Sequence, residues 1–343
     1  MNKTKSSLIY ILKSYAILFV IFAHSTGIIE NVCNFSQYSS KCAQVIGTMG
    51  VPIFFAISGY LVFFNEKNFR NFLINKIKKI LIPAIISGSI VYLYVHLRKG
   101  NLSFLTYLNF IIGNGSYLYF ITLLFAFFIL FYFLKKKNKI TLIIEIMLFL
   151  ISLTNFFLNY YHVISLPGSP YLNPFYFIIY FLVGFIINKY HVQKTMNKIV
   201  NNYLILCIAF CCSIALLILG TIDLLQISYF SPMYLLFTLC NSIWLTKLSL
   251  ITDNKLQKSI GKYSFSIYLY HMPFAGVVAN LFNRIPKYSP VFIRPFIVLS
   301  LTYTIILVYK KLSEMMKIDI INPFLGIPRE VKESKINDSS ESN

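Results

Sequence analysis

The sequence has 343 residues, of which 57% are hydrophobic and 12% are charged. Soluble proteins carry about a quarter charged residues, so this composition excludes a soluble globular protein and fits a protein surrounded by lipid. The formal net charge is +20, but the positive charges lie in short clusters between apolar runs. That pattern is typical of membrane proteins rather than of nucleic-acid binding. We therefore expect membrane lipid, and no nucleic acid, as a partner.

Ten apolar segments are long enough to cross a bilayer as helices. The first follows a basic N-terminus but has no small-residue cleavage site after it, so we interpret it as a retained helix and not as a signal peptide. The sequence thus predicts an all-α, polytopic transmembrane helix bundle over residues 1–328, followed by a disordered cytoplasmic tail over residues 329–343. The predicted spans are 8–29, 47–64, 80–97, 115–134, 140–157, 174–189, 202–221, 230–248, 263–282 and 293–311.

The Lys and Arg residues predict the orientation of these helices. If the N-terminus is cytoplasmic, 25 of the 31 Lys and Arg residues fall in the predicted inner segments. The positive-inside rule then places both termini in the cytoplasm. The loop that contains Cys33 and Cys42 is extracytoplasmic in this arrangement, and there the two thiols can form a disulfide. The sequence has no Cys and His spacing typical of a zinc site, so we expect no metal.

The first predicted helix carries Lys13 near its inner end and His24 far along it. Eleven residues make three helical turns plus about 20°, so the two side chains share one face and lie about 16 Å apart. Ionisable residues inside a membrane are costly, and a functional role is the usual hypothesis for them. The alternative is a lysine that extends to the surface and a histidine that is hydrogen-bonded within the bundle.

Two further basic residues, Lys76 and Lys79, come just before the third predicted span. With a spacing of i,i+3 on a helix they share one face. They can bind phosphate groups at the cytoplasmic surface. The alternative is the ordinary positive charge of inner segments, in contact with lipid headgroups.

Small and polar residues occur in the second and ninth predicted spans. In the second, Ser58 and Gly59 belong to a run of small residues that permits close contact between helices. In the ninth, Ser264, Tyr268 and His271 stand at i, i+4 and i+7 and form a polar stripe. Such a stripe is expected to face a cavity or another helix rather than lipid. Helix packing is the alternative to a functional role for both sets.

At these residues the chain resembles the acyltransferase-3 family, bacterial membrane enzymes that move acyl groups, commonly acetyl from acetyl-CoA, onto cell-surface glycans. The resemblance covers nearly the whole chain in the family's order. It rests on a basic residue followed eleven positions later by histidine, a Phe-Phe-x-x-Ser-Gly-aromatic signature, a basic pair before a proline, two aromatic landmarks and a late Ser-x-x-x-Tyr-x-x-His element. In this chain these are Lys13 with His24, residues 50–60, Lys76 and Lys79 before Pro83, residues 117–120 and 177–184, and residues 264–271.

The resemblance implies an O-acyltransferase of the bacterial inner membrane. Acetyl-CoA is then its donor substrate, with no bound cofactor, and a surface polysaccharide or its lipid-linked precursor is the acceptor. His24 is implied as the general base, and whether an acyl-histidine forms stays open. The residues implied in donor binding are Lys13, Lys76 and Lys79, and those in acceptor binding or positioning are Ser58, Gly59, Ser264, Tyr268 and His271.

The chain departs from the family at the donor-binding positions, where the family usually has arginine. Lysine cannot make a bidentate contact with phosphate, so donor binding is expected to be weaker or altered. Two other functions fit the residues alone. One is a transporter or glycan exporter with polar residues along its pathway, and the other is a non-catalytic partner in glycan synthesis. The histidine and lysine on one helix face favour acyl transfer, which uses such a pair.

Overall fold

The computed structural model describes residues 3–26, 34–64, 68–97, 100, 102–161, 169–283 and 291–328. Within these ranges the chain is helical and contains no strand. The α-helices are α1 (Lys3–Ser25), α2 (Asn34–Thr48), α3 (Gly50–Leu61), α4 (Phe69–Lys76), α5 (Ile82–Leu97), α6 (Phe104–Ile112), α7 (Tyr119–Phe133), α8 (Lys139–Tyr160), α9 (Ile178–Lys189), α10 (Gln193–Asn201), α11 (Tyr203–Thr221), α12 (Pro232–Ile251), α13 (Lys255–Lys262), α14 (Ser264–Asn283) and α15 (Arg294–Met315). The shorter segments are the 3₁₀ turns η1 (Val62–Phe64), η3 (Pro170–Leu172), η4 (Pro174–Tyr176) and η5 (Asp319–Leu325), and the π-helical turn η2 (Ile77–Leu81).

The predicted all-α, polytopic bundle is confirmed. Among the described residues, 8 helical segments are long and apolar enough to cross a membrane, and two shorter apolar helices, α7 and α9, accompany them. These ten coincide with the ten predicted spans. The predicted tail, residues 329–343, lies outside the described residues.

Two spans begin earlier than predicted. The second begins at Gln37 instead of residue 47, because the polar residues that were predicted as a loop form α2, which packs against α1 and α11. The third begins at Phe69 instead of residue 80, so Lys76 and Lys79 lie inside this span and not just before it. Lysine side chains are long enough to reach the membrane surface from within a helix.

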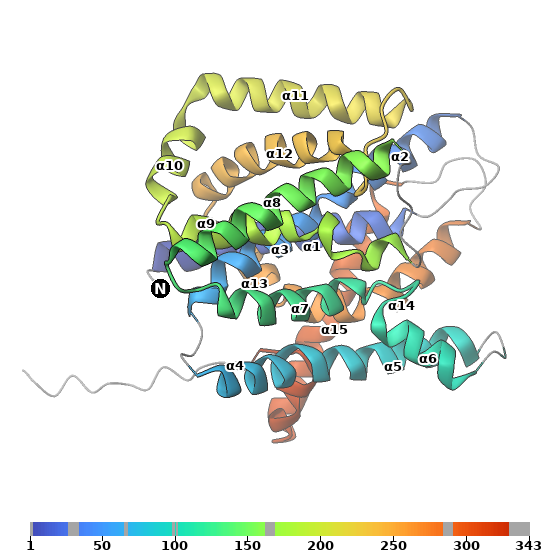
Figure 1. Cartoon of the computed structure of the whole chain (residues 1–343). Helices are drawn as coiled ribbons and strands as arrows, with labels where there is room; N and C mark the ends of the chain where they lie inside the picture. The colour runs from blue at the N-terminus through green and yellow to red at the C-terminus, as the bar shows by residue number, and fades with distance from the viewer. Residues whose placement is uncertain are drawn as a thin grey trace, which may run out of the picture.

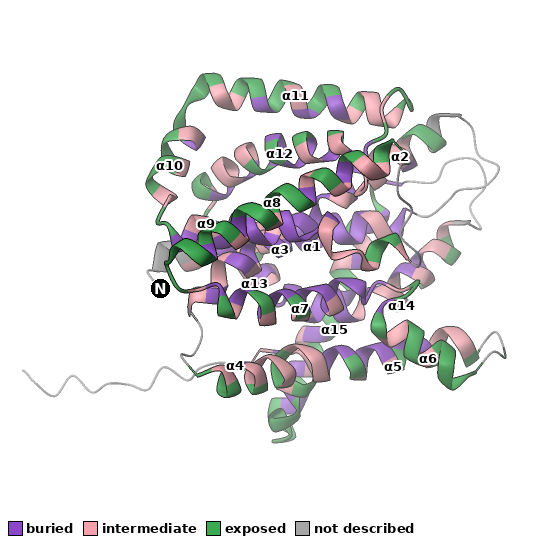
Figure 2. Cartoon of the chain, viewed as in Figure 1, coloured by how far each residue is buried: buried purple, intermediate pink, exposed green. Residues whose placement is uncertain are grey.

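Helix α1 lies in the centre of the bundle. It contacts α2, α3, α12, α13, α14 and α15, and Figure 2 shows α1 and α3 as mainly buried in the middle of the molecule. At the periphery, α8 and α11 expose many large apolar side chains, which is the surface that lipid requires. The N-terminal end of α1 and α10 lie at one end of the bundle, and α6 lies toward the other (Figure 1).

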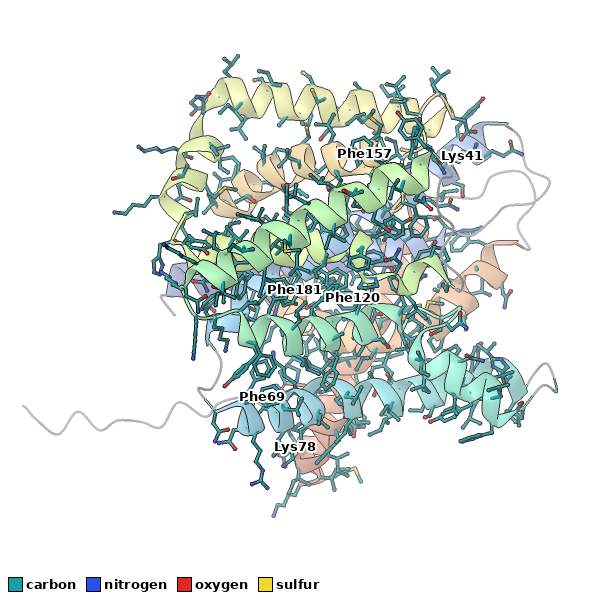
Figure 3. The ribbon with its side chains drawn as sticks, in the orientation of Figure 1. Lys41, Phe69, Lys78, Phe120, Phe157 and Phe181 are labelled. Atoms are coloured by element: carbon teal, nitrogen blue, oxygen red, sulfur yellow. The ribbon has the colours of Figure 1, made fainter. Side chains whose placement is uncertain are left out.

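Aromatic rings and a glycine pack the interior helices closely. Phe120 and Phe181 lie in the interior in Figure 3, and their ring centroids lie 4.8 Å from Phe55 and 4.7 Å from Phe131. Helices α3 and α9 cross where Gly59 meets the backbone of α9; a Cβ at Gly59 would lie 2.0 Å from the Phe181 carbonyl oxygen. Close helix crossings at small residues are typical of membrane bundles.

Candidate active site

The structure brings His24 and His271 together from the two ends of the sequence. His24 lies in the last turn of α1 and His271 lies on α14, which packs against α1. Their ring centroids are 5.2 Å apart. His271 is fully buried, whereas His24 is half-buried and lines a cavity. The sequence predicted both residues as site residues, but not that they are neighbours.

A backbone hydrogen bond orients the His271 ring. Its Nδ1 lies 2.7 Å from the carbonyl oxygen of Tyr268. A carbonyl only accepts, so Nδ1 carries the proton and donates, and Nε2 of the neutral ring keeps its lone pair. Nε2 is buried and has no hydrogen-bond partner among the described residues. A buried, unsatisfied acceptor is uncommon and is a feature that active sites retain.

Two tyrosines hold the backbone around His271. The Tyr268 hydroxyl donates to the carbonyl oxygen of Tyr117, and the Tyr117 hydroxyl donates to the carbonyl oxygen of Leu269 at 3.1 Å. The ring centroids of Tyr117 and Tyr268 lie 5.7 and 5.9 Å from that of His271. Tyr268 therefore positions His271, and Tyr117 does the same from the segment before α7. Tyr117 was not predicted as a site residue, although it begins one of the two aromatic landmarks.

The cavity that His24 lines, here called the His24 cavity, has a volume of about 1000 Å³. Its walls come from helices α1, α2, α3, α5, α6, α7, α11 and α14, from η3, from the segment between α6 and α7, and from the connection between α11 and α12. Tyr117 lines it beside His24. A cavity of this size accommodates a drug-sized organic ligand. Most of its lining residues come from segments that the sequence did not connect with a site.

The predicted donor-binding lysines lie together, and a fourth joins them. The charge of Lys76 interacts electrostatically with Lys13, Lys135 and Lys79. The Lys76 Nζ lies 3.5 Å from the centroid of the Phe128 ring, a cation–π contact. We call these four residues the lysine cluster. None of the ion pairs between described residues includes one of them.

Lys135 was counted only as part of the inner positive charge and was missed as a site residue. Its Nζ lies 4.6 Å from the ring centroid of Tyr132 and 5.1 Å from that of Phe72. It follows α7 at the helix end, where the chain turns toward α8. The only feature of the sequence that could have identified Lys135 as a site residue is its position one helix after the aromatic landmark at residues 117–120.

A π-helical turn separates the faces of Lys76 and Lys79, which the sequence predicted to share one face. Pro83 has no N–H to donate to the carbonyl of Lys79, and the Ile82 N–H instead bonds the carbonyl of Ile77. Each residue of this wider turn rotates through a smaller angle than in an α-helix, so three residues no longer return to one face. Lys76 is half-buried, whereas Lys79 is exposed.

Three other predicted site residues lie away from the histidines. Gly59 is in the α3–α9 crossing, where it has a packing role. Ser264 is the first residue of α14, and seven residues put it about 10 Å along the axis from His271. Ser58 is half-buried on α3 and is not among the described residues that line the His24 cavity.

The predicted disulfide stays a prediction. Cys33 lies outside the described residues. Its proposed partner, Cys42, lies on α2 as a free thiol and is half-buried.

A buried ion pair anchors the end of α7. Glu145 is 2% exposed and pairs with Lys189, which is 1% exposed. The Lys189 Nζ also donates to the carbonyl oxygen of Leu134 at 2.7 Å. Burial, and then the bond to Glu145, raise the pKa of Tyr190, so its phenol stays protonated and donates to that carboxylate. Leu134 precedes Lys135, so this network fixes the backbone beside the lysine cluster.

Comparison with protein families assigns nearly the whole chain to one family. Residues 9–310 match the acyltransferase-3 family, which is described as an acyltransferase domain. No curated protein and no solved structure matches the chain. The matched region includes both histidines and the whole lysine cluster. The chain is a multi-pass membrane protein and belongs to the acyltransferase-3 family.

Proposed function

We propose that this acyltransferase is an O-acetyltransferase of the bacterial inner membrane, which moves acetyl from acetyl-CoA to a hydroxyl of a surface polysaccharide or its lipid-linked precursor. The observation that carries the proposal is the arrangement along α1. The middle of this helix contributes Lys13 to the lysine cluster, and its C-terminal end carries His24 on the wall of the His24 cavity. One helix thus carries both a positive charge that can bind a phosphorylated donor and a base that can assist acyl transfer.

The lysine cluster is the proposed site for the phosphates of acetyl-CoA. Four like charges that lie together repel one another, and phosphate anions relieve this repulsion through charge-assisted hydrogen bonds. Lysine acts here as a point charge rather than as a bidentate partner. The positive-inside rule puts this end of the bundle in the cytoplasm, where acyl-CoA is available. The thioester arm then extends along α1 toward His24, about 16 Å away.

The proposed reaction at the His24 cavity is direct acyl transfer. The acceptor hydroxyl attacks the carbonyl carbon of the thioester, a C–O bond forms, and the C–S bond breaks. His24 takes the hydroxyl proton as the bond forms and returns it to the leaving thiolate, which is general acid–base catalysis. His271 lies beside His24, and its hydrogen-bonded ring positions the His24 ring and the reacting groups.

The surface glycan of a deletion strain tests this function. Mass spectrometry should find that the glycan has lost acetyl groups and that the restored gene returns them. The amount of glycan at the surface should be unchanged, which separates acetylation from export. A glycan with its acetyl groups intact would contradict the proposal.

A further inference from the structure

Four aromatic rings form one wall of the His24 cavity. They are contributed by α7, η3 and the connection from α11 to α12, namely by Tyr119, Tyr171, Tyr229 and Phe230. The Tyr171 ring centroid lies 5.1 Å from Tyr119, 5.2 Å from Phe230 and 6.1 Å from Tyr229. Tyr119 is buried, whereas Tyr171 is 40% exposed. Tyr171 is therefore held by its neighbours while part of its ring stays accessible.

The charges that the described residues contribute to this cavity balance. The charged side chains among its described lining residues are Lys41 and Asp223. Lys41 is on α2, Asp223 follows α11, and the two form an ion pair. Their side chains are 43% and 69% exposed, so the pair lies at the solvent-facing mouth. The described residues thus give the mouth one positive and one negative charge.

This lining differs from the lysine cluster, which gathers around Lys13 in the middle of α1. There, positive charges gather without an acidic partner among the described residues, as a phosphorylated ligand requires. The described lining of the His24 cavity offers an anionic ligand no such gathering of positive charge. Burying an unpaired carboxylate or phosphate is costly. Aromatic faces pack well against the C–H faces of sugar rings, and phenol hydroxyls bind sugar hydroxyls. The lining therefore matches an uncharged, polyhydroxylated ring.

We propose that the His24 cavity takes its acceptor as a neutral sugar residue packed on Tyr171, and that the Lys41–Asp223 pair at its mouth makes it prefer neutral to acidic sugars. This inference rests on the proposed function and specifies its acceptor. The carboxylate of an acidic sugar is attracted to Lys41 and repelled by Asp223, so the intact pair gives it no net attraction. Removing either partner leaves a net charge at the mouth, which then attracts or repels the carboxylate.

The first test measures charge selectivity in the purified, lipid-reconstituted protein. The acceptors are methyl glycosides of glucose, galactose and mannose, each beside the corresponding uronic acid, with acetyl-CoA as donor. The wild-type protein should acetylate a neutral sugar with higher kcat/KM than its uronic acid, and we call the quotient of these two kcat/KM values the selectivity ratio. Asp223→Asn should lower the selectivity ratio about threefold and Lys41→Gln should raise it about threefold. The changes are small because exposed charges interact weakly. The double variant should restore the wild-type ratio.

The second test addresses Tyr171. Tyr171→Ala should raise the KM for the neutral acceptor about tenfold and leave the KM for acetyl-CoA unchanged, and Tyr171→Phe should keep most of the affinity. Tyr161→Ala is the matched control, because Tyr161 is 69% exposed at the end of α8 and does not line the cavity. Its acceptor KM should equal that of the wild type.

The possible outcomes separate this inference from the function on which it rests. Equal use of neutral and acidic sugars, or a ratio that the Lys41 and Asp223 variants leave unchanged, would overturn the inference while acetyl transfer stands. An unchanged acceptor KM in Tyr171→Ala would show that the acceptor sugar does not pack on Tyr171 and would overturn that part of the inference. A folded protein that binds acetyl-CoA but acetylates none of the glycosides, while the deletion strain keeps a fully acetylated glycan, would overturn the proposed function together with the inference.

Discussion

At the scale of single residues, Gly59 lies at a contact that a larger side chain cannot enter. Helix α9 approaches it with the carbonyl oxygen of Phe181, and the facing residue Gly184 approaches the carbonyl of Ala56 as closely; a Cβ on Gly184 would lie 1.8 Å from that oxygen. Both obstacles are backbone atoms, which cannot rotate away as a side chain can. The two glycines therefore determine how closely α3 and α9 pack.

We expect Gly59→Ala to destabilise the protein by about 1–3 kcal/mol, the usual effect of overpacking a core. Thermal unfolding in detergent measures this effect, and activity per folded molecule should stay close to that of the wild type. Gly276→Ala is the control for stability, because nothing lies within 4 Å of the Cβ it would add. A Gly59→Ala variant that is fully stable but inactive would instead indicate a direct role at the acceptor.

For single residues, the sequence predicts positions along a helix but not contacts between helices. Helical spacing placed Lys13 and His24 on one face of α1, and Tyr268 and His271 on one face of α14. Spacing within a helix contains no information about which face meets another helix. The contact between His24 and His271 was therefore not predictable, and neither was the contribution of Tyr117 from a third segment.

At the scale of elements, the π-helical turn η2 and the end of α7 together position the lysine cluster, the proposed donor site. The wider turn aims Lys76 inward at Phe128 and leaves Lys79 exposed. The buried Lys189–Glu145 pair fixes the backbone that carries Lys135. The sequence predicted basic residues here, but it treated 76–79 as an α-helix and Lys135 as part of a loop. The proline at 83 was the signal that the α-helical spacing fails.

We expect Lys76→Ala and Lys135→Ala each to raise the KM for acetyl-CoA about tenfold with a smaller change in kcat, because each removes a charge-assisted bond to phosphate. Steady-state kinetics with varied acetyl-CoA measure this effect. Lys78→Ala and Lys137→Ala are the matched controls, because both lysines are exposed neighbours in the same segments. Arginine at position 76 should be tolerated. A donor KM that changes equally in all four alanine variants would indicate general electrostatics, and one that changes in none would remove the lysine cluster from donor binding.

At the scale of the whole molecule, the ten apolar runs alone determined the fold class, because length and apolarity decide whether a helix can cross a bilayer. The helical α2 and the early start of the third span were missed. Polar residues on an amphipathic helix have a sequence pattern similar to that of a loop, and so do lysines near a membrane surface. The order of packing around α1 depends on contacts between helices that lie far apart in the chain, which the sequence pattern does not contain.

At this scale, both parts of the proposed site lie along α1. The lysine cluster gathers around Lys13 in the middle of this helix, and the His24 cavity lies at its C-terminal end. In the proposed function, a donor held by the lysine cluster and an acceptor held in the cavity meet at His24. If His24 is the general base, its loss must stop chemistry without preventing either substrate from binding.

The most direct test is acetyl transfer by purified His24→Gln, with folding and acetyl-CoA binding measured on the same sample. Glutamine keeps a hydrogen-bonding group but cannot accept the proton. We expect wild-type thermal stability and donor affinity, with kcat lowered about 100- to 10,000-fold. A His24→Gln protein that transfers acetyl at close to the wild-type rate would contradict the account.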